Sequence, residues 1–378
     1  AKYIRDGVKV VAMDVASSAN AYVIFETLND RGLDLSVLDL VKNHTFGNAG
    51  KRLAEVQANW ITMMSTIAGR QADDFLKVFW TSRWGRIQRG RLFDEWRARH
   101  DKLSPDKIVT LSKDLTVAAD RFSALEVSDH DAWSSCSNTC RRHVKTLSVL
   151  GSRQTWPLIL AAFDVFKPEQ MERLLRHLIV LTMRYQTVGR RRTGLLEIAS
   201  AKIAQRIFNK ELDTPQKVWK EYLPLVPKDK EFVEDFLRWI ETKSARARYV
   251  LAELEVAQYQ RSHKGESPDQ MPIWEDLTLE HIFPVNPGSE WADVMKADKA
   301  LKDECLDRLG NLCLLQGKPN KDSSAKSFIF KCENSYSKST LELTSGVTAH
   351  QSWNRQAIEK RQLELAKLAV FAWPLPQV

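Results

Sequence analysis

The helical spacing of apolar residues between about residues 51 and 260 is the feature that most constrains how this chain can fold. Apolar side chains recur there at intervals of three and four residues, and the pattern stops at glycine, proline and clusters of polar residues. Such spacing places apolar side chains along one face of an α-helix. No fixed-period repeat is evident, so the pattern predicts an irregular helical domain and not a solenoid.

Several helix starts in this stretch are marked by local signals. A serine or threonine before a proline is typical of an N-cap followed by the first helical position, and a lysine before a proline marks one further start. The expected starts are Ser104-Pro105, Thr214-Pro215 and Lys167-Pro168, the last of which opens a helix that extends through Tyr185.

The first fifty residues have a different character. Residues 8–15 are β-branched and resemble a short strand with no preceding partner, whereas residues 19–28 and 36–46 carry helical spacing. Ser36 is the expected N-cap of the second helix, with Asp39 three residues on as a weaker form of the capping-box acid. Because the chain does not begin with methionine, we expect a fragment of a longer protein.

A polar stretch rich in helix breakers, residues 260–272, is the best candidate for a domain boundary. Beyond it, short apolar runs at 277–283 and 312–315 alternate with loops, and helical spacing returns over 353–371. The sequence therefore predicts a mainly α chain, with an irregular helical domain followed by a small α+β domain. The expected domains are residues 1–50, 51–262 and 263–378.

Composition indicates the cell compartment and the kind of partner to expect for this chain. With 43% hydrophobic residues it can form packed cores. No run of about 18 apolar residues and no secretory signal appears, so we expect a soluble cytoplasmic protein with no membrane partner. Five scattered cysteines fit a reducing compartment better than a disulfide framework. The formal net charge of +8 favours a polyanionic partner such as nucleic acid.

Three short segments near the C-terminus together indicate a metal-dependent active site. Glu280 and His281 stand side by side at the end of an apolar run, Asn311 follows in a Gly-Asn-Leu segment, and Asn320 comes after a second apolar run. This order is typical of a ββα-metal site, in which a two-stranded ribbon delivers an acid and a base and a following helix returns an oxygen ligand. An isolated Glu-His pair usually lies on the protein surface and has no catalytic role, so the interpretation depends on the order of all three segments.

The chemistry of phosphodiester hydrolysis explains these residue types. It needs an activated water, a cation to neutralise the transition state and a group that orients the base. Glu280 and the Asn320 amide are oxygen donors that suit Mg²⁺, with Mn²⁺ as a substitute. His281 is the expected general base, and Asn311 is expected to fix the imidazole or its loop. Taken singly, the two asparagines are more often turn or cap residues.

Three groups of basic residues are candidate DNA contacts, although a charge run is usually only a solvated face. The first group interleaves arginines with Trp84, which suits phosphate contact and stacking. The second is a loop between two glycines, and the third closely follows the expected catalytic asparagine. The groups are Arg86, Arg89 and Arg91; Arg190, Arg191 and Arg192; and Lys321, Lys326 and Lys331.

At these residues about the last hundred positions resemble the nuclease half of the GmrSD family of modification-dependent restriction endonucleases. The resemblance implies that Glu280 and Asn320 hold the metal, that His281 is the general base, and that Asn311 is the middle asparagine of an HNH triad. It is carried by Glu280-His281-Ile282-Phe283-Pro284, Leu309-Gly310-Asn311-Leu312, Asn320, Phe328-Ile329-Phe330-Lys331 and the segment from Trp353 to Pro374.

Residues 25–43 resemble the end of the other, ParB-like half of that family, so residues 1–50 are expected to be its remnant. The motif-bearing front of that half is absent, and any nucleotide dependence tied to it is not carried over. In the full-length protein the missing N-terminal domain would be a partner. The resemblance implies phage defence by cutting DNA with modified bases or, in the related phosphorothioate-sensing Ssp systems, by nicking DNA under control of a backbone sulfur mark. Both branches stay open.

Other interpretations also stay open. The HNH unit could be degenerate in a DNA-binding or partner-binding subunit, and an RNA-directed nuclease or toxin is a further alternative. One HNH centre cuts one strand, so a double-strand break would require a homodimer or two successive cuts. Cys136 and Cys140 form a weak zinc pattern, and the other three cysteines lack the paired spacing of a structural zinc site, so no structural zinc is expected.

Overall fold

The computed structural model describes residues 36–67, 72–266, 273–317 and 325–377 and divides the chain into two compact units. The described residues are mainly helical and contain a two-stranded antiparallel sheet in the C-terminal part, as the sequence predicts. None of the described helices is long and apolar enough to span a membrane. Unit 1 contains the described residues up to Ser135, Trp156–Val165 and Ser200–Glu211, and unit 2 contains Cys136–Thr155, Phe166–Ala199 and the described residues from Leu212 onwards.

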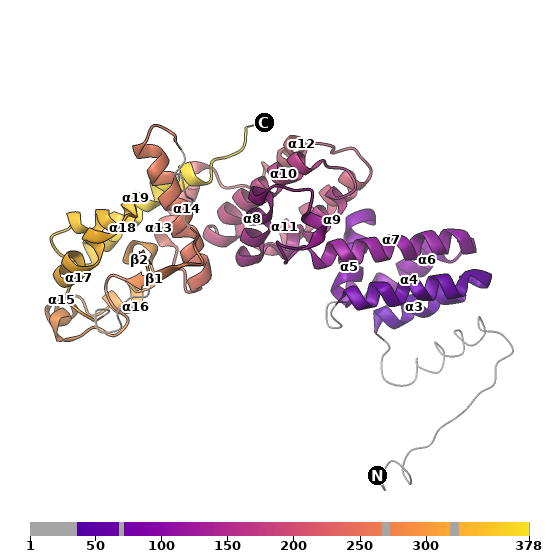
Figure 1. The fold of residues 1–378 in the computed structure, drawn as a ribbon, viewed down its shortest axis with the longest axis horizontal. Helices are drawn as coiled ribbons and strands as arrows, with labels where there is room; N and C mark the ends of the chain where they lie inside the picture. Colours follow the sequence, from indigo (N-terminus) through magenta and orange to yellow (C-terminus); the bar gives the residue numbers. More distant parts are fainter. Residues whose placement is uncertain (1–35, 68–71, 267–272, 318–324, 378) are drawn as a thin grey trace, which may run out of the picture. The chain divides into compact units, whose positions relative to one another are not determined.

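Unit 1 is built from amphipathic helices. They are α3 (Val37–Gly47), α4 (Leu53–Thr66), α5 (Ala72–Trp84), α6 (Leu92–His100), α7 (Pro105–Ser123) and α9 (Trp156–Ala162), with short 3-10 turns η1 (Gly50–Arg52), η3 (Arg89–Arg91) and η4 (Asp131–Trp133). Helix α4 packs along α7, and α5 packs along α9 (Figure 1). The buried side chains of α7 include Ile108, Leu111 and Leu115, whose spacing of three and four residues places them on one face.

Unit 2 begins with longer helices and continues into shorter elements. The longer helices are α8 (Asn138–Leu150), α10 (Pro168–Leu181), the π-helix η6 (Thr182–Val188), α12 (Pro215–Tyr222), α13 (Asp229–Arg238) and α14 (Ser244–Ser262). Helix α11 (Thr193–Phe208) starts in unit 2 and ends in unit 1. The later elements are α15 (Ala292–Ala297), α16 (Leu301–Cys305), α17 (Phe328–Asn334), α18 (Glu342–Ser345) and α19 (Arg355–Ala372), with 3-10 turns η7 (Ser289–Trp291), η8 (Leu309–Asn311), η10 (Tyr336–Lys338) and η11 (Gly346–Ala349). The 3-10 turn η5 (Arg153–Thr155) comes earlier, after α8.

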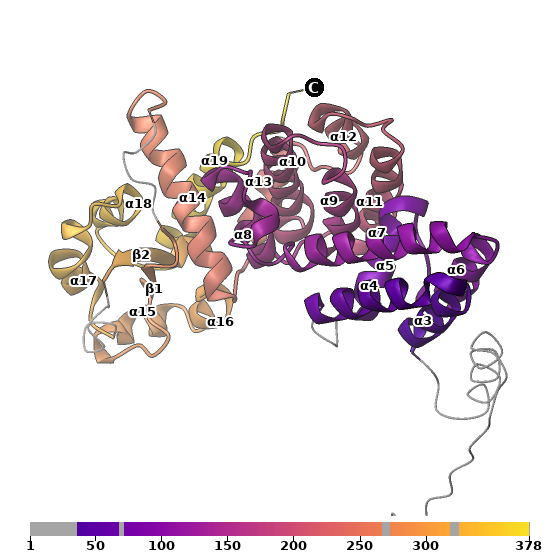
Figure 2. The same cartoon turned by 45° about the vertical axis from the view of Figure 1, so that its right-hand side comes forward.

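The sheet of unit 2 is a ribbon of β1 (Leu277–His281) and β2 (Leu312–Gln316). In its register Glu280 pairs with Cys313 and His281 with Leu312. Helix α14 packs on both strands, and α18 packs on β2 (Figure 2). The loop after β1 contributes Ile282 and Phe283 to a buried cluster that also contains Trp291, Trp353 and Ile358. The apolar residues of the loop thus anchor the ribbon in the core of this region.

The local signals predicted the helix starts correctly, including α7, which begins at Pro105 directly after Ser104, although the Ser104 side chain makes no capping hydrogen bond. Ser36 caps α3 and Thr214 caps α12, each through a side-chain oxygen that accepts a backbone N–H. Helix α10 begins after Lys167 as predicted, but it ends at Leu181 and continues as the π-helix that contains Tyr185. The sequence pattern does not distinguish these two windings, because both keep apolar residues at short helical intervals.

The expected domain boundaries at residues 50 and 262 stay a prediction, and the two compact units divide the described residues at other positions. The expected helical domain, residues 51–262, contributes to both units. Its last helix, α14, packs on the ribbon and on α19 within unit 2. The expected strand at residues 8–15 and the expected helix at 19–28 lie outside the described residues.

Candidate active site

Strand β1 presents Glu280 and His281 on opposite faces, because successive side chains of a strand alternate. Their partners differ accordingly. Glu280 interacts with Lys331 of α17, whereas His281 interacts with Asp307 in the turn that follows α16. The two side chains therefore have separate surroundings in this conformation, although they are neighbours in the sequence.

The buried ammonium of Lys331 fixes the end of β1. Its Nζ lies 2.7 Å from Glu280 Oε1 and also donates to the carbonyl oxygens of His281, at 2.9 Å, and of Ile282, at 3.2 Å. These three acceptors satisfy the three donors of an ammonium group. Lys331 is only 3% exposed, so removing either charge would leave the other buried without compensation. The ion pair thus holds the backbone from which His281 projects.

Asp307 is the partner of His281 and was not among the residues predicted from the sequence. Its Oδ1 lies 3.1 Å from His281 Nε2. A carboxylate that accepts a hydrogen bond from Nε2 selects the tautomer with a lone pair on Nδ1, and it orients the ring. Asp307 lies 26 positions after His281, and the signal that could have found it is its place directly before the Arg-Leu-Gly-Asn segment.

Asn311 clamps the loop that follows His281. Its Nδ2 donates to the carbonyl oxygens of Phe283 and Leu306, each at 3.0 Å. Its Oδ1 accepts from the N–H of Phe283, at 2.8 Å, and from Trp353 Nε1, at 2.9 Å. The side chain is fully buried and four hydrogen bonds occupy its amide. These contacts make Asn311 a positioning residue for the loop, and none of them is to the imidazole.

The turn that carries Asn311 is fitted tightly to α19. A Cβ at Gly310 would lie 2.3 Å from the carbonyl oxygen of Ile358, so no larger residue fits without a shift of the backbone. The Gly310 N–H donates to Gln362 Oε1 at 2.6 Å. Buried Arg361 donates to the carbonyl oxygens of Leu309, Gly310 and Leu312 at 2.7 to 3.1 Å. Helix α19 therefore holds the turn in place.

The described residues do not complete a metal site by themselves. Among them no group of three or more His, Cys, Asp and Glu side chains could hold an ion. Glu280 offers the oxygen chemistry that a hard divalent ion prefers, but its Oε1 bonds Lys331. Asn320, the other expected ligand, and Lys321 lie outside the described residues. The donor types suit Mg²⁺, and the expected convergence of Glu280, His281 and Asn320 on one ion stays a prediction.

The basic residues expected at DNA in unit 2 have different surroundings. Lys331 is engaged in the buried pair and has no access to a phosphate in this conformation, whereas Lys326 is exposed, with its Nζ 3.9 Å from Glu290. Arg190 donates to the carbonyl oxygen of Ile240, and Arg191 pairs with two acidic residues of α13. Arg192 is exposed.

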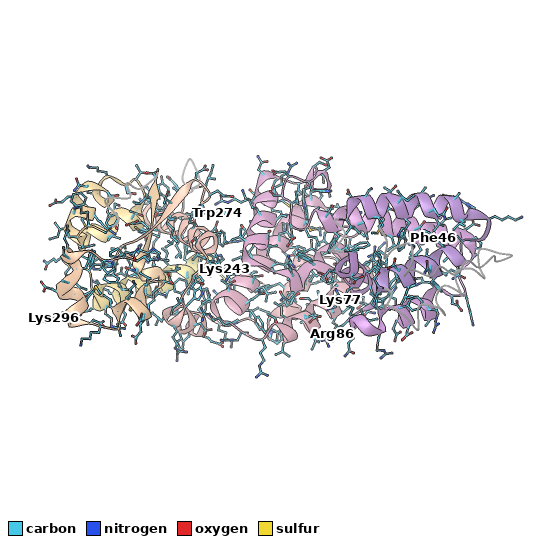
Figure 3. All side chains as sticks on the ribbon, turned by 90° about the horizontal axis from the view of Figure 1, so that it is seen from below. Phe46, Lys77, Arg86, Lys243, Trp274 and Lys296 are labelled. Atoms are coloured by element: carbon cyan, nitrogen blue, oxygen red, sulfur yellow. The ribbon has the colours of Figure 1, made fainter. Side chains whose placement is uncertain are left out.

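The arginines expected at DNA in unit 1 follow α5. Arg86, labelled in Figure 3, is exposed. Arg89 pairs with Asp74 at 2.8 Å, and Arg91 pairs with Glu95 at 2.6 Å. Exposed pairs of this kind contribute little stability, so both guanidinium groups can exchange their partner for a phosphate.

The cysteines are free thiols in the structure. Burial raises the pKa of Cys313, which pairs with Glu280 across the ribbon, to about 12. Burial also raises the pKa of Cys140, and a hydrogen bond with Cys136 acts in the same direction. A raised pKa disfavours the thiolate that zinc and nucleophilic chemistry need.

A family model matches the C-terminal part of the chain. Residues 226–368 match the family model described as GmrSD restriction endonucleases, C-terminal domain, which confirms the resemblance inferred from the sequence. The matched region contains the ribbon, α17 and most of α19, and it starts before α13, well upstream of the expected domain start at 263. The match implies a nuclease of modification-dependent restriction with DNA as its substrate, in a family that is generally metal-dependent. No curated protein matches the chain.

Proposed function

Because residues 226–368 form a GmrSD-type C-terminal domain, we propose that this chain is a metal-dependent HNH endonuclease that nicks or cuts DNA in the restriction of modified DNA. The observation that carries the proposal is the His281–Asp307 pair at the end of a two-stranded ribbon, next to a loop that Asn311 clamps. A base oriented by a carboxylate, on a rigid backbone, is what water activation requires.

In this proposal His281 acts as the general base. With Nε2 bonded to Asp307, the lone pair on Nδ1 accepts a proton from a water molecule. The water oxygen forms a bond to phosphorus while the bond from phosphorus to the leaving oxygen breaks, and that oxygen is protonated from solvent. Asp307 stabilises the imidazolium that results.

The other residues position the reacting groups. Glu280 and Asn320 would hold a divalent cation, which when bound neutralises charge on the scissile phosphate and on the leaving oxygen. Lys331 and Asn311 keep the end of β1 and the following loop fixed, so that His281 does not have to reorganise during the reaction. Lys326 is a proposed phosphate contact, and so is Lys321, which follows Asn320 in the sequence.

Plasmid nicking tests the assignment of His281. In the presence of Mg²⁺ or Mn²⁺, His281→Ala should slow nicking by at least about 100-fold, the usual contribution of a general base. Asp307→Asn should reduce the nicking rate less and change its dependence on pH, because the His281 imidazole is still present but no longer has a carboxylate partner. His263→Ala is the matched control, because His263 is an exposed histidine of the same unit, at the C-terminal end of α14. Nicking by His281→Ala at the rate of the unchanged protein would refute the assignment.

A second candidate is a DNA-binding or partner-binding subunit with a degenerate HNH unit. The ion pair of Glu280 with Lys331 favours it, because a carboxylate neutralised by a lysine is less available to a metal ion. The two candidates differ in their response to a chelator. Nicking that EDTA abolishes and Mg²⁺ restores supports the enzyme, whereas DNA binding without any nicking supports the subunit.

The kind of DNA attacked is a separate part of the proposal. We propose modified DNA as the substrate, with the base modification and the backbone phosphorothioate as the two branches to compare. Unmodified, base-modified and phosphorothioate plasmids, each assayed with a matched single-stranded RNA, would identify the branch. Preferential cleavage of the RNA would overturn the assignment of DNA.

A further inference from the structure

A cleft of roughly 490 Å³ in unit 1 is lined by aromatic and cationic side chains. It lies where α5, the segment after it and α6 meet, and its lining includes Trp80, Trp84, Arg86, Arg91, Glu95 and Arg99. Three guanidinium groups face a single carboxylate, so the lining carries an excess of positive charge. Its size falls within the range of about 300–1,000 Å³ that is usual for small-molecule sites. The cleft lies outside residues 226–368, the family match.

The sequence builds this cleft from two stripes of residues spaced by four. Trp80 and Trp84 lie on one face of α5, and Arg91, Glu95 and Arg99 lie along η3 and α6. Gly85 ends α5 with a φ of +93°, a conformation that L side chains rarely adopt, and turns the chain towards α6. This turn brings Arg86 to the lining of the cleft.

The contacts inside the cleft suit a flat, anionic ligand. The guanidinium carbon of Arg99 lies 4.8 Å from the ring centroid of Trp84 and 5.8 Å from that of Trp80. The two indole centroids are 4.7 Å apart. Trp84 is half-buried, and Arg99 is exposed. A planar cation stacked on an indole can accept a base on its outer surface, as arginine and aromatic planes do for unstacked bases.

We propose that this cleft binds one unpaired nucleotide of DNA. Its base stacks on the Trp84–Arg99 pair, while Arg86 and Arg91 contact its phosphate groups. The Arg91–Glu95 pair is exposed and weak, so a phosphate can replace Glu95 as the partner of Arg91. A duplex does not offer an unstacked base, so the cleft selects a flipped or single-stranded nucleotide. The inference rests on the proposed function in so far as DNA is the substrate.

The test measures binding in protein that carries His281→Ala, without divalent ions, so that cleavage does not interfere. Fluorescence anisotropy with a labelled single-stranded DNA hexanucleotide, a duplex and an RNA of the same sequence gives the three affinities. Adding Arg99→Ala should weaken single-stranded DNA binding by roughly 5- to 100-fold, the range for loss of one stacked base, while duplex affinity changes less than about twofold. Trp84→Phe should retain most of the binding, and Trp84→Ala should lose it.

Arg97→Ala is the matched control. Arg97 lies on the same helix, is exposed and stacks on Phe93, and it does not line the cleft. Equal effects of Arg99→Ala and Arg97→Ala, an equal loss of duplex binding, or tighter binding of RNA than of DNA would each overturn the proposal. Plasmid nicking by the unchanged protein is measured in parallel. Because the binding assay needs no cleavage, it can be interpreted even if the unchanged protein does not nick DNA. If the unchanged protein nicks DNA but Arg99→Ala does not weaken binding, the cleft proposal fails and the proposed nuclease function stands.

Discussion

Among the single residues of the candidate active site, Lys331 is a buried charge with all three of its donors bonded. Its ammonium is surrounded by Glu280 and two backbone carbonyl groups, and it is almost completely buried. From the sequence, a lysine after an expected catalytic asparagine looked like a phosphate contact. Its true partner precedes it by 51 positions, a pairing that only the fold of the ribbon against α17 creates. The same holds for Asp307 and His281, whose residue types are visible in the sequence while their pairing is not.

Lys331→Met should destabilise unit 2 by about 3–5 kcal/mol, because it leaves the Glu280 carboxylate buried without a counter-charge. Chemical denaturation monitored by circular dichroism measures the change. Lys331→Met combined with Glu280→Gln should recover part of the loss, and Lys326→Met, on the exposed part of the same region, should stay within about 0.5 kcal/mol of the unchanged protein. A single Lys331→Met variant as stable as the unchanged protein would contradict the role given to this pair.

At the scale of elements, the turn η8 packs closely against helix α19 and is hydrogen-bonded to it. The sequence contains an apolar run at 312–315 and predicts a helix over 353–371, and these correspond to β2 and α19. It did not predict that they touch, because the contact depends on the missing side chain of Gly310 and on Arg361 reaching backbone carbonyl groups. Local signals such as the Ser36 and Thr214 caps involve atoms only three residues apart, which is why they could be predicted.

Gly310→Ala should destabilise the protein by about 1–3 kcal/mol, because the new methyl group would collide with the Ile358 carbonyl oxygen and force α19 away. Thermal unfolding measures the effect, and nicking activity should fall with it as the Asn311 clamp shifts. Gly346→Ala is the control: an added Cβ meets nothing within 4 Å there, and the backbone φ is −60°. Equal behaviour of the two variants would contradict the close fit described for η8.

Glu255 links α14 to α18 and makes stability depend on pH. Its carboxylate accepts the backbone N–H groups of Glu342 and Leu343 at the start of α18. Burial nevertheless raises the pKa of Glu255 from 4.5 to about 7, with the nearby Glu342 charge adding to the rise. Between these values the folded state holds a proton that the unfolded state has lost, so stability falls as pH rises through this window.

Replacing Glu255 by Gln should remove this dependence. Relative to Glu255→Gln, the unchanged protein should lose up to about 3 kcal/mol of unfolding free energy between pH 4.5 and 7, and little more above that. Urea unfolding at several pH values gives the difference between the two proteins, which cancels the contribution of other groups. A difference that is flat with pH, or that grows in favour of the unchanged protein, would show that the Glu255 pKa is not raised.

At the scale of the whole molecule, the sequence separated helical from mixed regions, and the domain bounds at residues 50 and 262 stay a prediction, although the two compact units group the described residues differently. The polar stretch at 260–272 looked like a domain boundary because breakers and charged residues gather there. Yet α14, which precedes it, packs on β1, β2 and α19. A polar connection in sequence marks a surface loop, and whether the elements on its two sides share a core depends on faces that meet only after folding.

The proposed catalytic centre at His281, one in each chain, predicts the course of DNA cleavage. On supercoiled plasmid, nicked circles should accumulate before linear molecules, because each turnover hydrolyses one phosphodiester and the second strand needs an independent event. A time course on an agarose gel separates the forms. Linear DNA that appears at once, without a nicked intermediate and in proportion to the square of protein concentration, would instead indicate two chains acting together.

The hydrogen bonds of Gln362 to residues before position 263 determine how this protein can be divided for experiments. Gln362 Nε2 donates to the carbonyl oxygens of Phe236 and Trp239, at the far end of α13. An expression fragment that starts at 263 would leave these donors without acceptors and would strip α14 from the sheet. The smallest piece expected to fold independently therefore begins ahead of α13 and retains α19 to its final turn.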